Sequence, residues 1–116
     1  MPAQEDYIVV KPKHSAFFGT TLSVLLQHLG TKTLIIGGFA GNVCCLFTAN
    51  DAYMHDFSLL CPSDCMGHSS PEEEDASLLL MRKVLKVSTK ESTQINLDTL
   101  LKKHHDIEVE CRECGR

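Results

Sequence analysis

The sequence contains no apolar run that approaches the roughly 18 residues needed to cross a bilayer. It also has no excess of basic residues: the net charge is −4, which argues against a nucleic-acid-binding or membrane-binding surface. Residues 1–6 are acidic and lack the apolar segment of a secretory signal. We therefore expect a soluble, cytoplasmic (intracellular) protein with no nucleic-acid or membrane partner. A length of 116 residues suffices for one small domain and excludes a two-domain enzyme with a cleft between its domains.

Cysteine, in contrast, is abundant. The six cysteines fall into three pairs, Cys44 and Cys45, Cys61 and Cys65, and Cys111 and Cys114. Reduced thiols are a better interpretation than a disulfide scaffold, because no secretory signal is present and the aliphatic residues suffice for a core. The last four cysteines, with His104 and His105, are residue types that bind zinc. An exposed tail is the simpler explanation, so we predict no metal and no cofactor.

Short apolar segments alternate with helical patterns along the chain. Strands are expected at residues 7–10, 33–36 and 57–61, with a short extended piece at 86–88. Helices are expected at residues 22–29, 42–55, 70–85 and 96–105. Continuously apolar strands that alternate with helices indicate an α/β fold with a parallel sheet covered on both faces. We assign residues 1–105 to one domain and residues 106–116 to a polar tail.

The third helix has the clearest boundary signals. Ser70 is a preferred N-cap, and Pro71 suits the first helical position. The acidic residues 72–75 complement the positive end of the helix dipole, and Arg82 and Lys83 lie near its end. This charge pattern is explained by helix stability alone and needs no ligand.

One strand-to-helix turn carries a thiol. Residues 37–44 end in Cys44, which the pattern places in the first turn of a helix, where the helix dipole favours the thiolate. Backbone N–H groups there lack intrahelical partners and are available to an oxyanion. Lys11, at the end of the first expected strand, would add a cation at the same sheet edge, a combination suited to acyl transfer through a thioester. The simpler alternative is a buried small hydrophobe at Cys44 and a solvated lysine.

Four motifs extend this interpretation through a resemblance to isochorismatase-like cysteine hydrolases. They are the lysine segment Ile8 to Thr20 with Ser15-Ala16-Phe17-Phe18-Gly19-Thr20, the turn Gly37 to Cys44, the helix segment Thr48 to Tyr53, and Leu59 to Gly67 with Asp64-Cys65-Met66-Gly67. The family includes isochorismatases, nicotinamidases, N-carbamoylsarcosine amidohydrolases and ureidoacrylate amidohydrolases. Its members have a three-layer α/β/α fold and an Asp, Lys and Cys triad.

The resemblance implies roles for individual residues. Cys44 would be the nucleophile and Lys11 the cation beside it, since Lys11 rather than Lys13 stands four residues before Ser15-Ala16-Phe17. The family's cis peptide would fall between Phe39 and Ala40, and the amides of Ala40 and Cys44 would form the oxyanion hole. The substrate would be a small amide-like or isochorismate-like molecule.

Two departures from the family pattern affect these expectations. Gly41 stands where the family commonly has threonine, and the triad aspartate, which the family carries on a strand upstream of the lysine, has no counterpart; Asp6 is too close to Lys11 to replace it. The chain thus resembles an N-terminally truncated form of the fold, either a fragment of an active hydrolase or a catalytically dead relative that acts as an interaction module. An uncovered sheet edge would then pair with a partner chain or a second copy. His68, directly after Gly67, could reach the mouth of the site, but an ordinary loop histidine is the simpler interpretation.

Overall fold

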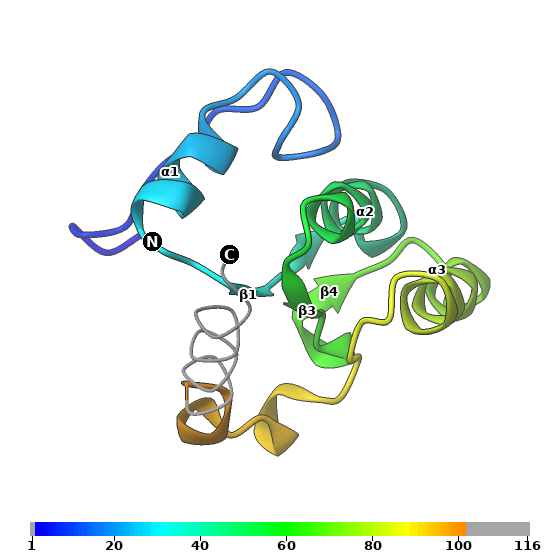
Figure 1. Cartoon of the computed structure of the whole chain (residues 1–116). Helices are drawn as coiled ribbons and strands as arrows, with labels where there is room; N and C mark the ends of the chain where they lie inside the picture. The colour runs from blue at the N-terminus through cyan, green and yellow to red at the C-terminus, as the bar shows by residue number, and fades with distance from the viewer. Residues whose placement is uncertain (1, 102–116) are drawn as a thin grey trace.

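The computed structural model describes residues 2–101, which form an α/β fold with parallel strands (Figure 1). The strands are β1 (Thr33–Ile35), β2 (Gly38–Phe39), β3 (Ser58–Leu60) and β4 (Met66–Gly67). β1 pairs in parallel with β3, and β2 pairs in parallel with β4. The Ile36 amide donates to the Leu60 carbonyl at 2.8 Å, so the hydrogen bonding continues just beyond β1. The expected α/β class and the strands near residues 33–36 and 57–61 are confirmed.

Ser88 extends the sheet on the far side of β3. It forms a parallel bridge with Leu60, and its carbonyl accepts the Cys61 amide at 2.8 Å. The extended piece predicted at residues 86–88 therefore lies beside β3, with β1 on the opposite side. The order β1, β3, Ser88 follows the order of the segments in the sequence.

Three helices accompany the strands: α1 (Leu22–His28), α2 (Leu46–Met54) and α3 (Pro71–Lys83). Parallel neighbours need a crossover connection, and α2 supplies it between β1 and β3, while α3 supplies it between β3 and Ser88. α2 and α3 contact each other and lie on the same side of the strands, with α1 apart from them (Figure 1). None of the helices in residues 2–101 has the length and hydropathy that a membrane crossing requires.

The local signals of the third helix are confirmed. Ser70 Oγ accepts the Glu73 amide at 3.2 Å, and Pro71 occupies the first turn of α3. The second predicted helix is divided into a π-helical turn, η1 (Gly41–Cys45), and α2, which ends at Met54. Two short 3₁₀ turns complete the elements, η2 (Ser63–Cys65) and η3 (Ser92–Gln94). Of the helix predicted at 96–105, residues 97–101 are helical; its remainder and the predicted tail 106–116 lie outside the described residues.

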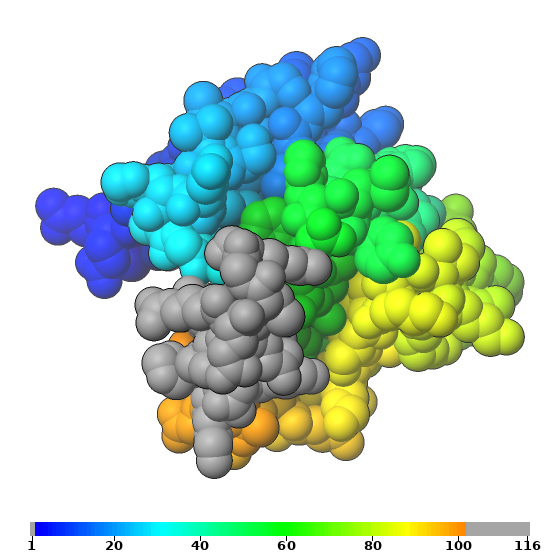
Figure 2. Space-filling view, viewed as in Figure 1, coloured from blue at the N-terminus to red at the C-terminus, as the bar shows by residue number. Residues whose placement is uncertain are grey.

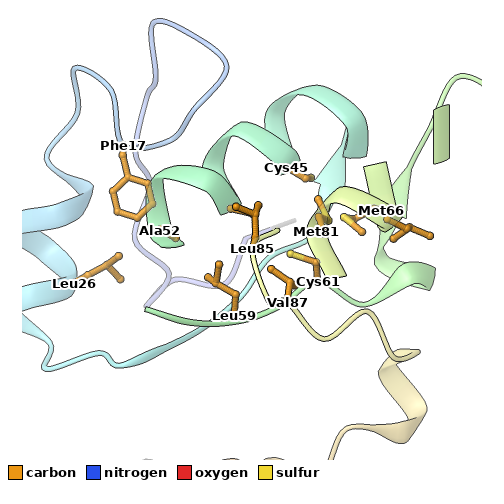
Figure 3. Packing of buried hydrophobic residues seen from close by; sticks show 12 residues of the cluster. Phe17, Leu26, Cys45, Ala52, Leu59, Cys61, Met66, Met81, Leu85 and Val87 are labelled. Atoms are coloured by element: carbon orange, nitrogen blue, oxygen red, sulfur yellow. The ribbon is translucent and has the colours of Figure 1, made fainter. Parts of the chain in front are cut away.

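The core lies between α2 and α3 on one side and β3, the central strand, on the other (Figure 3). Its central residues are Met81 of α3 and Cys61 after β3, both with 0% exposure. Ala49 and Ala52 of α2 are equally buried, and these small side chains let the helix approach the strands closely. The remaining buried hydrophobic residues are Phe17, Leu26, Cys45, Leu59, Met66, Leu78, Leu85 and Val87.

The strand predicted at residues 7–10 is not formed, so that prediction is wrong. The segment belongs to neither strand pair, and Tyr7, Ile8 and Val10 are 64%, 77% and 87% exposed. An apolar, β-branched segment becomes a strand only where a neighbouring strand offers hydrogen-bonding partners, and no strand of the described residues lies beside this one. The first residues, in dark blue, stand out from the side of the molecule in the space-filling view (Figure 2).

Candidate active site

Lys11 and Cys44 meet in space although they are far apart in the sequence. Lys11 Nζ lies 3.6 Å from Cys44 Sγ, and it also donates to the carbonyl of Lys13 at 3.0 Å. The lysine reaches the thiol from an irregular segment, not from the end of a paired strand as expected. Cys44 is half-buried in η1, directly before α2, so its sulfur lies close to both a cation and a helix start. Both features stabilise negative charge on sulfur.

The segment after Lys11 contacts α2 and the two aromatic residues that follow it, His55 and Phe57. The Ala16 amide donates to Thr48 Oγ1 at 3.0 Å. The ring of His14 stacks on Phe47 with centroids 6.0 Å apart, and the ring of Phe17 stacks on His55 at 5.3 Å and packs against Phe57 at 6.2 Å. These contacts hold the segment along the helix whose start carries the thiol.

Hydrogen bonds within the Ser-Ala-Phe motif shape the segment itself. Ser15 is buried, and its Oγ accepts the Phe17 amide at 3.1 Å. Thr20 Oγ1 donates to the carbonyl of Ala16 and accepts the Leu22 amide at 3.2 Å, which joins the segment to α1. The motif therefore folds the chain between Lys11 and α1 into one defined shape.

The turn before Cys44 contains the predicted backbone groups. The Phe39–Ala40 peptide bond is cis, at the position that the resemblance implies. The carbonyl of Ala40 accepts the amides of Val43 and Cys45 at 3.2 and 3.1 Å. Those two amides are thus already used inside the turn. An oxyanion hole formed by the amides of Ala40 and Cys44 stays a prediction.

Neighbouring cysteines differ sharply in their surroundings. Cys45 is buried, and desolvation raises the pKa of its thiol, with a further increase from Cys44 and an opposing effect of Lys11. Burial raises the pKa of Cys61 to about 12, and Cys45 adds to this increase. Both groups therefore stay protonated at neutral pH. Of the four cysteines in residues 2–101, only Cys44 has its sulfur beside a lysine ammonium.

Asp64 has a structural role. Its carboxylate accepts both the amide and the hydroxyl of Ser92, at 2.7 Å for the amide, and these bonds lower the pKa of Asp64. The contacts connect η2 to η3 on the surface. Asp6 accepts the Ala3 amide at 2.7 Å, and within residues 2–101 no carboxylate forms an ion pair with Lys11.

The described residues contain no cluster of three or more histidine, cysteine or acidic side chains able to hold a metal. Cys61 is buried behind β3, whereas Cys65 is exposed beside Asp64. Cys111, Cys114, His104 and His105, which the alternative zinc site would need, lie outside the described residues.

Comparison with known proteins agrees with this geometry. A family model described as the isochorismatase domain matches residues 1–92. The chain belongs to the isochorismatase family. It is 49% identical over 84 residues to the uncharacterized isochorismatase family protein YaaI of Bacillus subtilis (strain 168), covering 72% of this chain and 46% of that protein.

Solved structures of this family have the same fold. An isochorismatase family protein from Desulfovibrio vulgaris superposes with a TM-score of 0.80 at 28% identity, covering 88% of this chain and 52% of that one. An N-carbamoylsarcosine amidase from Thermoplasma acidophilum gives a TM-score of 0.72 at 26% identity, covering 82% and 53% of the two chains. The chain therefore spans about half the length of the relatives it matches.

The sequence indicated that Lys11 and Cys44 belong together, and the structure brings them together, but the residue that connects their segments was missed. Thr48 lies in α2, four residues after Cys44 of η1, and its hydroxyl accepts the Ala16 amide of the lysine segment. Its position within Thr-Ala-Asn-Asp-Ala was noted, but only as part of a motif. A polar side chain one helical turn after a reactive cysteine was the available signal.

Proposed function

We propose that this isochorismatase-family hydrolase domain uses Cys44 as a nucleophile on a small amide-like or isochorismate-like substrate. The observation that carries the proposal is the 3.6 Å separation of Lys11 Nζ and Cys44 Sγ. An ammonium group at that distance stabilises the thiolate, which is the nucleophilic form of cysteine. The N-carbamoylsarcosine amidase among the structural neighbours supports an amide-like substrate.

For an amide, the reaction has two covalent stages. The thiol proton is lost to solvent, and the sulfur attacks the carbonyl carbon, forming a C–S bond while the carbonyl electron pair moves onto oxygen. The amides of Ala40 and Cys44 receive that oxyanion. The C–N bond then breaks, the nitrogen leaves with a proton from water, and a second water hydrolyses the thioester to a carboxylic acid and the free thiol.

Lys11 acts by its charge and its position in this scheme. Its hydrogen bond to the carbonyl of Lys13 directs the ammonium toward the thiol. Among residues 2–101, no carboxylate pairs with Lys11 or hydrogen-bonds to Cys44 Sγ, so that part of the chain supplies no carboxylate base in contact with the thiol. We expect turnover to be slow unless a carboxylate is supplied by another chain or segment.

Turnover assays test the proposal directly. Purified protein is incubated with isochorismate, nicotinamide and N-carbamoylated amines, and product is followed by chromatography. We expect hydrolysis of at least one substrate class and its loss in Cys44→Ala. Equal product formation by the two proteins would contradict the nucleophile assignment. Lys13→Gln serves as the control for Lys11→Gln, since only the side chain of Lys11 contacts the sulfur.

A second function is favoured by a separate observation, the unpaired apolar segment 7–10. Tyr7, Ile8 and Val10 are exposed and belong to no strand pair of the described residues. We propose, as the alternative, a catalytically inactive family member whose exposed segment pairs with a partner chain. No hydrolysis of any substrate, together with stable capture of a second chain, would favour this function over the first.

A further inference from the structure

His68 packs directly against the turn that carries Cys44. Gly41 is buried, and a Cβ built on it would overlap the His68 ring, 2.5 Å from Cε1. The backbone of Gly41 is not in the left-handed region, so glycine is required here for space and not for its conformation. The imidazole therefore occupies the volume that a side chain at position 41 would fill.

The same end of the imidazole is held by α3. Ser77 Oγ lies 3.0 Å from His68 Nε2 and donates its proton to the carbonyl of Glu74 at 3.1 Å. With the hydroxyl proton of Ser77 directed at the Glu74 carbonyl, Oγ can accept from the Nε2–H tautomer of His68. Ser77 is 2% exposed, so the hydrogen bond is buried on the Ser77 side, while His68 is partly exposed. His68 is thus anchored at its ring tip and is not a freely rotating loop residue.

His68 contacts the segment of Cys44, as Thr48 contacts the segment of Lys11. Gly41 lies in η1, three residues before Cys44, and η1 contacts both α3 and β4. Thr48 fixes the segment of Lys11 on α2, whereas His68 fixes the turn of Cys44 against α3. The distance between ammonium and sulfur depends on both.

We propose that His68 is a positioning residue, anchored by Ser77, whose ring sets the place of the Gly41–Cys44 turn relative to Lys11. This inference deepens the proposed function and rests on the role of Cys44 given there. It also explains the departure at position 41. A threonine side chain and the His68 ring would compete for one space, so glycine and histidine form a matched pair in this chain.

Alkylation of Cys44 by iodoacetamide, mapped by peptide mass spectrometry on the full chain, tests the pairing without any substrate. We expect Gly41→Ala to slow Cys44 alkylation at pH 7 about tenfold, because a displacement near 1 Å disrupts a positioned pair. Adding His68→Gly frees the space and should recover part of the lost rate, a non-additive rescue, but not the wild-type rate, because the ring that positions the turn is removed as well. Alkylation of the exposed Cys65 should be the same in wild type, in Gly41→Ala and in the double variant.

Gly37→Ala is the matched control. A Cβ there would lie 2.9 Å from the backbone oxygen of Cys65, so removal of the His68 side chain offers it no relief. The inference would be overturned if Gly41→Ala left the alkylation rate of Cys44 unchanged. It would also be overturned if the double variant Gly41→Ala, His68→Gly were alkylated as slowly as Gly41→Ala. If Gly41→Ala fails to fold, recovery of a cooperative melt in the double variant supports the pairing, and persistent unfolding contradicts it. Equal reactivity of Cys44 and Cys65 in wild type would instead refute the proposed function, while the rescue pattern would still decide the role of His68.

Discussion

The amide of Ala16 donates a 3.0 Å hydrogen bond to Thr48 Oγ1, and this bond joins the segment of Lys11 to the helix that follows Cys44. Thr48 is therefore one of the contacts that hold the lysine segment along α2. The bond is partly buried, so a lost acceptor would leave the Ala16 amide without a partner.

We predict that Thr48→Val lowers both stability and thiol reactivity. Valine keeps the shape of threonine but accepts no hydrogen bond, so the free energy of unfolding should fall by about 1 kcal/mol. Cys44 alkylation should slow several-fold, because Lys11 is no longer held beside the sulfur. Urea denaturation and peptide mapping measure the two effects. Thr21→Val, at an exposed position with no capping hydrogen bond from its side chain, is the control.

The thiols should differ in reactivity over a pH series. If Lys11 and the helix start act on Cys44, iodoacetamide should modify it at lower pH than Cys45, Cys61 or Cys65, and Lys11→Gln should remove the difference between Cys44 and the exposed Cys65. Lys13→Gln should leave it intact, since the Lys13 side chain makes no contact with the sulfur. Uniform modification beginning only near about pH 8.5, the value of a free thiol, would show that the site is not assembled.

Local signals predicted α3 correctly, whereas the N-terminal strand required knowledge of its neighbours. Ser70 and Pro71 act within one helical turn, so the sequence alone contains the whole cause. An apolar segment such as residues 7–10 indicates only that a strand would be tolerated. Whether it forms depends on an adjacent strand, which the described chain does not provide.

The same distinction applies to the site. The order of the motifs indicated that Lys11 and Cys44 belong to one site, and the structure brings their side chains together. The contact of His68 with Gly41 joins segments far apart in the chain and was not foreseen; His68 was interpreted as an ordinary loop residue. A glycine needed for space rather than for its backbone angles leaves no signal in the sequence by itself.

We predict that removing the cap of α3 weakens the whole domain. Ser70→Ala removes the acceptor for the Glu73 amide and should cost about 1 kcal/mol, within the range measured for N-caps. Since α3 contributes Met81 and Leu78 to the core, the effect should appear in the global unfolding transition. Ser69→Ala changes an exposed neighbour outside the cap and should leave the melting temperature unchanged.

Stability should fall in alkaline solution because of the buried thiols. Cys61 has a pKa of about 12 in the folded chain against an ordinary value of 9.0, so between these values the unfolded state has lost the proton that the folded state retains. The contribution of the Cys61 thiol to the free energy of unfolding is fully present below pH 9. Above pH 9 the free energy of unfolding declines by about 1.4 kcal/mol per pH unit. Thermal melts from pH 8 to 11 should show this decline, reduced in Cys61→Ala. If the melting temperature fell equally steeply with pH in Cys61→Ala and Cys65→Ala, the decline would not come from the Cys61 thiol.

The last prediction concerns the exposed segment 7–10. Tyr7, Ile8 and Val10 are largely exposed, and their backbone belongs to no strand pair of the described residues. Unpaired apolar segments of this kind associate with other chains. We expect the purified chain to oligomerise, to aggregate or to melt at low temperature, and we expect a polypeptide carrying the N-terminal half of a full-length relative to rescue it in trans.

Lysine substitutions in the segment provide the matched test, because a charged side chain disfavours strand pairing between chains. Ile8→Lys and Val10→Lys should reduce light scattering and the apparent mass without affecting the folded core, since neither side chain is buried. Val24→Lys, at an exposed apolar position on α1, controls for the added charge. A monodisperse wild-type monomer with a cooperative melt above about 60 °C would contradict the prediction, because that stability exceeds the middle of the mesophilic range without any partner. The segment would then be an exposed tail of a self-sufficient domain, and the interaction module would lose the observation that favours it.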